Sequence, residues 1–367
     1  MIKKVGFLLL GGIHHGLHLI PAVSALQSNR NILPIVYVRT EIERLYCRDI
    51  LEKLGAYNVD IQIIKPPPLL KRTLVKHGTL LSNLHLWTKL DALVLAERTS
   101  TILKYMPIAR PILIHIPHGA GDRAKSYDPR IKRFDHVITA GPKDKRRMIK
   151  LKLVNEASCH VSGYIKPFAV QQMALPLPEL FKTQAPTVLY NPHFDKNLSS
   201  WPFFGRELLD LFSKTPKFNF IFAPHIRLFE SASKTERTDL ETFSRFDNIH
   251  VDLGSERSTD MSYTRAADIY LGDVSSQVYE FLSSPKPCIF IDNANRQWED
   301  NSDFSHWKFG PICKTPDAIM NAIEGAQTTH TAYKAAQIKG VSDTIGNPEW
   351  NPIERAAKFI SEWVLDA

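Results

Sequence analysis

The stretch AADIYLGDVSSQVYEFLSSPKPCIFID, residues 266–292, decides the fold because it holds two apolar runs separated by a helical pattern. The runs at 268–273 and 287–292 have continuously apolar centres, which is typical of strands buried on both faces of a parallel sheet. Ser275 and Ser276 stand just after the first run, where their hydroxyls can cap the start of a helix. The stretch therefore predicts a strand–helix–strand unit within a parallel sheet.

The same alternation of apolar runs and helical patterns extends over the whole chain. The other runs lie at 4–10, 32–38, 59–64, 92–96, 111–116, 136–140 and 159–163, and then at 187–191, 218–223 and 248–253. The alternation pauses at 166–186, a segment with four prolines and no clear strand. We therefore expect an α/β protein with two doubly wound, Rossmann-like domains at 1–165 and 187–345, a linker at 166–186, and a C-terminal helix at 346–367 that packs back on the first domain.

Composition points to a globular protein with an anionic partner. The chain has 367 residues, 44% of them apolar and 23% charged, and a formal net charge of +8. This excess favours nucleic acid, anionic lipid or a phosphorylated substrate. No apolar stretch is long enough to span a bilayer, and the N-terminal apolar run lacks a cleavage site for a signal peptidase. The four cysteines are far apart and fit no zinc spacing, which favours reduced core residues of a cytoplasmic protein.

One basic segment suggests contact with a membrane surface. Leucines at 70, 74, 81 and 84, together with Trp87, recur at helical spacing beside Lys71, Arg72 and Lys76. Such a stripe is typical of an amphipathic helix on an anionic membrane and equally of a surface helix whose leucines face the core. Both interpretations stay open at this point, and peripheral attachment to the inner face of the plasma membrane is the expectation.

Ligands of parallel α/β sheets bind beyond the carboxyl ends of the strands, so the loops after strands hold the candidate residues. After the first strand, GGIHHGLHL (11–19) places His14 and His15 in a glycine-rich loop that does not match the dinucleotide-binding pattern. We expect these two side chains to contact an acceptor substrate or to be solvated.

The loop after the fifth strand holds a stronger candidate. In PHGAGDRAK (117–125), His118 and Gly119 follow the apolar run, and Asp122 and Lys125 come next. A histidine can take a proton from a hydroxyl near neutral pH, and a carboxylate can orient its ring. We therefore expect His118 to be catalytic, with Asp122 orienting it, or else to be a loop histidine that is bonded to the backbone.

The second half contains the corresponding loops for a phosphorylated ligand. In FIFAPHIRLF (220–229), His225 and Arg227 follow a strand and can neutralise charge on a departing group. In the decisive stretch, Asp273 ends a strand, and Ser275 and Ser276 precede a helix whose unpaired N–H groups suit a pyrophosphate.

Two further residues complete the candidate set in the second half. Glu280 lies further along the same expected helix, where it can accept hydrogen bonds from ribose hydroxyls. His193 follows the strand at 187–191 and is a further candidate for contact with donor or acceptor.

Together these motifs resemble the CDP-glycerol glycerophosphotransferase family of teichoic acid primases and polymerases. His118-Gly119 matches the family's HG motif, His225 matches the histidine of its HP motif but is followed by Ile226, and Asp273, Ser275 and Ser276 match its third motif with Val274 in place of an aromatic residue. The similarity is clear over roughly 110–295.

The resemblance implies a GT-B fold whose two domains face each other across a cleft. It also implies transfer of glycerol phosphate from CDP-glycerol to a hydroxyl of a lipid-linked glycan, with His118 activating the acceptor and His225 assisting at the pyrophosphate. The serines at 275 and 276 would hold the donor phosphates.

Three other functions remain open from the sequence. Glu280 and the departures from the motifs also suit a GT-B glycosyltransferase that uses a UDP-, GDP- or CMP-sugar, or a related epimerase that isomerises a nucleotide sugar. A non-catalytic basic module for anionic lipid or nucleic acid is the third, but no nucleic-acid motif or aromatic stacking platform is present, so we expect no nucleic-acid partner. No D-x-D triplet occurs, no residue set is assigned to a metal, and use of a divalent cation stays open.

Overall fold

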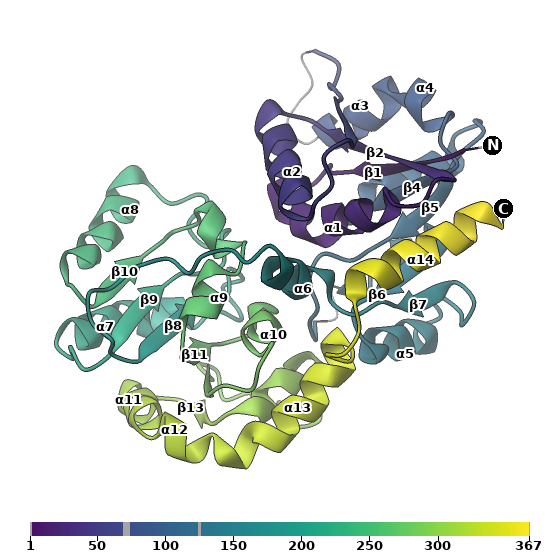
Figure 1. Cartoon of the computed structure of the whole chain (residues 1–367). Helices are drawn as coiled ribbons and strands as arrows, with labels where there is room; N and C mark the ends of the chain where they lie inside the picture. The colour runs from purple at the N-terminus through teal and green to yellow at the C-terminus, as the bar shows by residue number, and fades with distance from the viewer. Residues whose placement is uncertain (1, 69–73, 124–125, 367) are drawn as a thin grey trace. The chain divides into compact units, whose positions relative to one another are not determined.

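The computed structural model describes residues 2–68, 74–123 and 126–366, and the chain divides into two compact units (Figure 1). The first unit comprises Met1–Ala120, Lys125–Leu175 and Ser342–Ala367, and the second comprises Gly121–Ala124 and Pro176–Val341. The short loop at 121–123 therefore packs with the second unit although the residues on both sides of it belong to the first.

The first unit is built around a seven-stranded parallel sheet with the order β3-β2-β1-β4-β5-β6-β7. Its strands are β1 (Lys3–Leu8), β2 (Ile32–Val38), β3 (Asp60–Ile63), β4 (Ala92–Leu95), β5 (Ile112–His115), β6 (His136–Thr139) and β7 (Cys159–Val161). Its helices are α1 (Gly16–Leu26), α2 (Glu41–Lys53), α3 (Val75–Ser82), α4 (Leu84–Trp87), α5 (Pro142–Lys150), α6 (Ile165–Gln172) and α14 (Pro352–Leu365).

Helices cover both faces of this sheet. Leu80, Trp87 and Met148 of α3, α4 and α5 pack against alternate strand side chains such as Leu93 and Leu95. Helix α1 contacts α2, α6 and α14, so the C-terminal helix packs within the first unit. The segment expected to be a linker thus begins with a helix, α6, that packs on the first unit.

The second unit is built around a six-stranded parallel sheet with the order β10-β9-β8-β11-β12-β13. Its strands are β8 (Thr187–Asn191), β9 (Asn219–Phe222), β10 (Ile249–Val251), β11 (Ile269–Gly272), β12 (Cys288–Ile291) and β13 (Ile312–Cys313). Its helices are α7 (Trp201–Ser213), α8 (Lys234–Glu241), α9 (Ser262–Ala266), α10 (Gln277–Phe281), α11 (Pro316–Glu324), α12 (Ala326–Thr329) and α13 (Thr331–Ile345), the last of which continues into the first unit.

Apolar side chains on both faces of the second sheet form the core of this unit. Phe212 of α7, Leu240 of α8 and Ile319 of α11 pack against one face of the sheet, next to strand residues such as Phe220 and Leu271. On the other face, Phe281 of α10 lies against Tyr270, with ring centroids 5.6 Å apart. The doubly wound α/β architecture predicted from the alternating pattern is confirmed for both units.

Each sheet reverses its strand order at one point. In the first unit the chain adds β2 and β3 on one side of β1, and then β4 to β7 on the other. In the second unit the reversal lies between β8 and β11. Crevices for ligands form at such switch points, beyond the carboxyl ends of the two strands. The loops after β1 and β4, and after β8 and β11, are therefore the places to examine.

The basic segment at 70–87 does not form one amphipathic helix. Asn83 separates α3 from α4, and Trp87 is fully buried with its indole N–H donating to the carbonyl of Leu80 at 2.8 Å. Leu74 and Leu81 are exposed, whereas Lys71 and Arg72 lie outside the described residues. Part of the apolar stripe thus belongs to the core. Among the described residues, no helix has both the length and the apolarity that crossing a bilayer requires.

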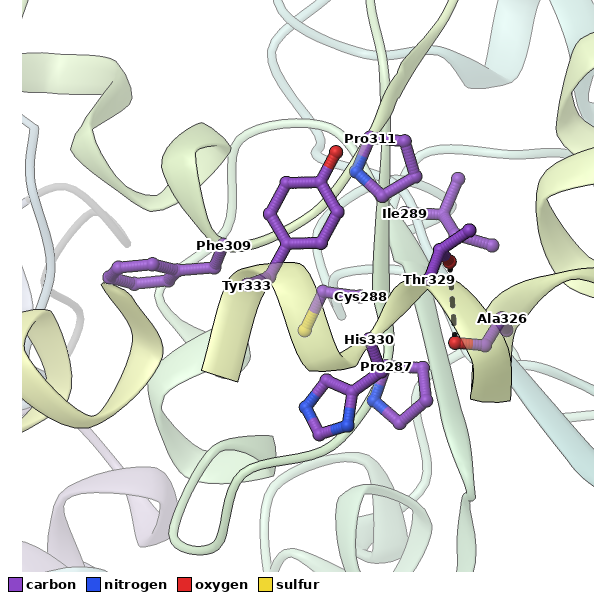
Figure 2. A pocket seen from close by; sticks show the side chains of 9 residues that line it. All are labelled: Pro287, Cys288, Ile289, Phe309, Pro311, Ala326, Thr329, His330 and Tyr333. Atoms are coloured by element: carbon purple, nitrogen blue, oxygen red, sulfur yellow. Dashed lines mark hydrogen bonds between the residues drawn. The ribbon is translucent and has the colours of Figure 1, made fainter. Parts of the chain in front are cut away.

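A small pocket in the second unit lies at the amino end of β12 (Figure 2). Its lining is largely apolar and includes Cys288, Phe309 and Tyr333, and its volume is about 10 Å³. Ligand pockets measure roughly 300–1,000 Å³, so this space is a packing defect of the core and not a nucleotide site. The opposite, carboxyl end of the sheet holds the polar loops.

A buried histidine in β5 makes the stability of the first unit sensitive to acid. Burial lowers the pKa of His115 to about 3, and its Nδ1 lies 3.1 Å from the carbonyl of Leu95. The unfolded chain binds a proton at this side chain below about pH 6.5, whereas the folded chain does not, so stability is complete above that pH and falls as the pH decreases towards 3.

We expect His115→Leu to flatten this pH dependence by roughly 1 kcal/mol per pH unit between pH 6 and pH 4. Urea unfolding at a series of pH values measures the slope, and His85→Leu, a change at an exposed histidine, is the matched control. Equal slopes for the wild type and His115→Leu would contradict the assignment.

Candidate functional site

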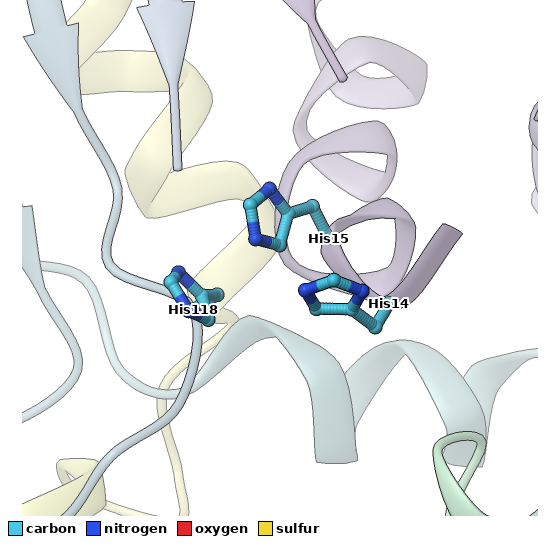
Figure 3. A group of neighbouring side chains, drawn as sticks. All are labelled: His14, His15 and His118. Carbon is cyan, nitrogen blue, oxygen red and sulfur yellow. The ribbon is translucent and has the colours of Figure 1, made fainter. Parts of the chain in front are cut away.

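Three histidines from the loops after β1 and β5 meet beyond the carboxyl ends of the strands of the first sheet. His14 and His15 lie in the turn Ile13–His15 between β1 and α1, and His118 lies in the loop after β5 (Figure 3). One ring nitrogen from each lies within 4.8 Å of those of the other two, and the ring centroids of His15 and His118 are 4.3 Å apart. We call this group the three-histidine cluster. His14 and His15 were predicted from one loop and His118 from another, and the structure brings the three together.

The backbone before α1 fixes the ring of His15. A Cβ atom at Gly11 would lie 1.9 Å from Cε1 of that ring, so the imidazole rests directly on the glycine. His15 is 2% exposed, and its Nδ1 has no hydrogen-bond partner within the described part of the chain. An unsatisfied buried nitrogen is rare in native proteins and calls for an explanation such as a bound ion or water.

The ring of His118 is oriented by a backbone carbonyl. Its Nδ1 lies 2.8 Å from the carbonyl oxygen of Ala96, the residue directly after β4. A carbonyl oxygen can only accept a hydrogen bond. The proton of the neutral ring is therefore on Nδ1, and Nε2 carries the lone pair. Gly119 has a φ of 100°, in the left-handed region that favours glycine, which turns the chain directly after His118. Ala96 thus has the role expected for Asp122.

Burial, with a smaller contribution from neighbouring charges, lowers the pKa values of the imidazoles in the cluster. Burial lowers the pKa of His14 to about 4, with further contributions from His118 and Lys76, and burial lowers the pKa of His15 well below its usual value. Burial also lowers the pKa of His118, against the opposing effects of the Ala96 hydrogen bond and the Glu97 carboxylate. All three rings therefore offer lone pairs at neutral pH.

Glu97 is a site residue that the sequence analysis missed. It follows β4, is 7% exposed, and accepts hydrogen bonds from the backbone N–H groups of Thr99 and Ser100. The rule that selected His118, a polar side chain directly after a strand, also selects Glu97 after the run at 92–96.

In the second unit, Asp273 organises the loops at the switch point. Its carboxylate is 1% exposed and accepts hydrogen bonds from the backbone N–H of His193 at 2.9 Å, the backbone N–H of Ser200 at 2.6 Å and the Ser200 hydroxyl at 2.9 Å. Burial raises the pKa of Asp273, and these hydrogen bonds act in the opposite direction. The loop after β8 is thereby tied to the end of β11, so Asp273 is a positioning residue.

Histidines and cations from separate loops gather next to Asp273. The rings of His193 and His225 have centroids 5.6 Å apart, and the ring of Phe194 lies 4.5 Å from that of His225. The guanidinium of Arg227 lies 4.1 Å from the centroid of Phe194, and Arg123 contacts Nε2 of His193. We call the group formed by Arg123, His193, Phe194, His225 and Arg227 the second-unit loop cluster.

The tautomer of His225 follows from its own loop. The backbone N–H of Arg227 donates to Nδ1 of His225 at 3.2 Å, so Nδ1 is the accepting nitrogen and Nε2 carries the proton. A neutral His225 can therefore donate a hydrogen bond through Nε2 to an anionic ligand.

Ser275 and Ser276 lie directly before helix α10, where they were expected, and the helix is short. Helix α10 begins at Gln277 and has five residues, and neither serine is its first helical residue. Ser275 is buried and accepts from the N–H of Gln277 at 3.3 Å, whereas Ser276 is exposed at the N-cap without a capping hydrogen bond from its side chain. Glu280 is 7% exposed and lies in the first turn of α10.

Asp122 lies in a different environment from the one expected. Its carboxylate accepts hydrogen bonds from the hydroxyl of Tyr279 at 2.8 and 2.9 Å and from Nδ1 of His306 at 2.8 Å. The indole N–H of Trp307 donates to the carbonyl of Asp273 at 2.8 Å. Asp122 therefore supports the second unit, and the expectation that it orients His118 is replaced by the Ala96 contact. Lys125, the other residue expected in this loop, lies outside the described residues.

No family model matches the sequence, and no curated protein matches it in a sequence search. Solved structures do match the fold over nearly the whole chain. The structure of UDP-GlcNAc 2-epimerase from Neisseria meningitidis bound to UDP-GlcNAc has a TM-score of 0.65 and 16% identity, covering 100% of each chain. MnaA from S. aureus in a structure with UDP has a TM-score of 0.67 and 13% identity, covering 99% of this chain and 97% of that one.

A wall teichoic acid polymerase is also similar in fold. TagF, in a structure of a His-to-Asn variant with CDPG, has a TM-score of 0.65 and 13% identity, covering 99% of this chain and 88% of that one. Identities this low establish the fold and no more. The chain has the GT-B fold, with two Rossmann-like domains, as predicted.

Proposed function

We propose that this protein is a transferase that moves a polyol phosphate from a CDP-activated donor to a hydroxyl of a cell-envelope glycan or lipid-linked acceptor. The observation that carries the proposal is the orientation of His118: with Nδ1 bonded to Ala96, Nε2 is available to take a proton. The fold shared with TagF supports this assignment.

The proposed reaction needs a proton acceptor for the attacking hydroxyl and groups that stabilise charge on the donor phosphates. His118 Nε2 accepts the proton of the acceptor hydroxyl while the acceptor oxygen forms a bond to the phosphorus that bears the polyol. The bond between that phosphorus and the oxygen of CMP breaks, and CMP leaves with the bonding electron pair. His225 Nε2–H and the Arg227 guanidinium stabilise the charge on the phosphates, with hydroxyl contacts from Ser275 and Ser276.

A second candidate is an enzyme that acts on a nucleotide sugar. Its support is the fold shared with the UDP-GlcNAc 2-epimerase and the buried Glu280 beside the serine loop. In that case the same second-unit loop cluster would hold a UDP-, GDP- or CMP-sugar. The proton acceptor His118 would then serve either a glycosyl transfer or an isomerisation.

Product analysis with a panel of donors distinguishes these functions. The protein is incubated with CDP-glycerol, CDP-ribitol and several nucleotide sugars, each with and without a membrane extract as acceptor, and the nucleotides are separated by chromatography. We expect CMP from a CDP-polyol. A nucleoside diphosphate from a sugar donor, CMP released from a CMP-sugar, or an isomerised nucleotide sugar, would assign the second function and refute the first.

We also propose that the enzyme works at the cytoplasmic face of the membrane, where a lipid-linked acceptor would be found. The support is the net charge of +8 and the exposed Leu74 and Leu81 beside Lys76. Replacing Lys71, Arg72 and Lys76 by alanine should reduce co-sedimentation with anionic liposomes. Unchanged sedimentation would refute surface attachment through this segment.

A further inference from the structure

The three-histidine cluster has the ligand set of a transition-metal site. Each imidazole contributes one nitrogen, and the three nitrogens lie within 4.8 Å of one another. In a tetrahedral zinc site with Zn–N bonds of about 2.0–2.1 Å, ligand nitrogens are about 3.4 Å apart. To bind one ion, the ligand nitrogens therefore need to approach one another by up to about 1.4 Å. Three protein ligands leave a fourth position open.

The hydrogen bond of His118 adds the feature that accompanies most metal-binding histidines. Such a histidine usually donates its other ring N–H to a carbonyl or carboxylate, which fixes the ring and its tautomer. Nδ1 of His118 lies 2.8 Å from the carbonyl of Ala96, so Nε2 is the ligand nitrogen. The contact of His15 with Gly11 holds a second ring in place independently.

The chemistry of the surroundings selects the class of ion. Neutral imidazoles without thiolates or several carboxylates favour Zn²⁺ and similar first-row ions over Mg²⁺ or Ca²⁺. The positive charges of Lys76 and Arg98 disfavour binding of a cation, as they disfavour protonation of His118, whereas the negative charge of Glu97 favours binding of a cation. Because Lys76 and Arg98 are positively charged, an oxygen anion or a hydroxyl is the fourth ligand that suits the open position.

We propose that His14, His15 and His118 bind one zinc-like divalent cation per chain, and that the cation competes with the proton for Nε2 of His118. The proposal that the cluster binds an ion does not depend on the proposed transfer reaction. The proposal that the ion competes with the proton for Nε2 of His118 does rest on the proposed transfer. An occupied site removes the base that the transfer uses, so zinc inhibits turnover in proportion to its occupancy.

Calorimetric titration of the full, untagged chain with Zn²⁺ tests the site directly. We expect one ion per chain, and affinity reduced at least about tenfold in His14→Ala and in His118→Ala, since even outer partners of metal ligands contribute 10–100-fold. The matched control is His85→Ala, at an exposed histidine on α4. Absence of binding, equal affinity in His14→Ala, or binding of inorganic phosphate in place of zinc would overturn the metal site.

Turnover measured in the same titration tests the competition. We expect activity to fall as zinc saturates the site and to return on addition of EDTA. Full activity at saturation would overturn the competition, and so would activity that requires zinc. Zinc binding by a protein that turns over no donor would leave the metal site standing and refute the proposed function alone.

Discussion

Replacing His118 with alanine is expected to reduce turnover by about two orders of magnitude or more, because general-base catalysis contributes roughly 10²–10⁴-fold. The ring is fixed by Ala96 with Nε2 available, and its loss removes the proton acceptor without changing the donor-binding unit. We expect the KM for the donor to stay near the wild-type value while kcat falls. Steady-state kinetics with the donor that the panel identifies measure both.

The control for this experiment separates a catalytic from a structural effect. His118 keeps part of its surface exposed, and thermal unfolding of the variant should match that of the wild type within a few degrees. His85→Ala, also at an exposed histidine of the first unit, should retain full turnover. Wild-type kcat in His118→Ala would remove this residue from the mechanism.

Replacing Asp273 with alanine is expected to destabilise the second unit by about 3–5 kcal/mol. The variant leaves the N–H groups of His193 and Ser200 buried without their acceptor, and each unsatisfied buried donor costs about 1–3 kcal/mol. Because the same hydrogen bonds tie the loop after β8 to β11, nucleotide affinity should fall as well. Urea unfolding monitored by tryptophan fluorescence measures the stability.

An exposed aspartate of the same unit provides the comparison. The side chain of Asp247 is 83% exposed, and Asp247→Ala should change stability by no more than about 0.5 kcal/mol. If Asp273→Ala unfolded at the same urea concentration as Asp247→Ala, the carboxylate would not hold the loops together.

The sheet architecture was predictable because its signal is local and repeated. All twelve strands expected from apolar runs are present with boundaries shifted by at most two residues, as for the run at 218–223, which forms β9 (Asn219–Phe222). Among the residues that the structure describes, the strand that was not predicted is β13, which has two residues, Ile312 and Cys313, and is too short for any periodicity. Its place at the edge of the sheet depends on pairing with β12.

Site residues were predictable in part, through one rule about the carboxyl ends of strands. That rule selected His14, His15 and His118, but which of them meet depends on strand order, which the sequence does not reveal. The same limitation explains Asp122: its neighbours Tyr279 and His306 are more than 150 residues away along the chain. Asp122 is only four positions from His118 in the sequence, which suggested a hydrogen bond between them. In the fold, Asp122 is bonded to Tyr279 and His306 instead.

The amphipathic segment shows how a pattern can be shared by two structures. Leucines at helical spacing predicted a helix at 70–87, and helices are present, but Asn83 interrupts them and Trp87 enters the core. The spacing of apolar residues predicts which face of a helix is apolar, but it does not predict whether that face contacts a membrane or the protein core. Tertiary packing decided between the two interpretations for Trp87.

Hydrogen–deuterium exchange with and without nucleotide tests most directly whether the donor binds at the β8/β11 switch point of the second unit. With saturating CDP, and with UDP in a parallel experiment, slower exchange is expected in the loops at 192–200, 224–228 and 273–277. The nucleotide that protects them more strongly identifies the donor class. Protection confined to the first-unit loops at 11–16 and 96–100, or none with either nucleotide, would contradict a donor site built around Asp273.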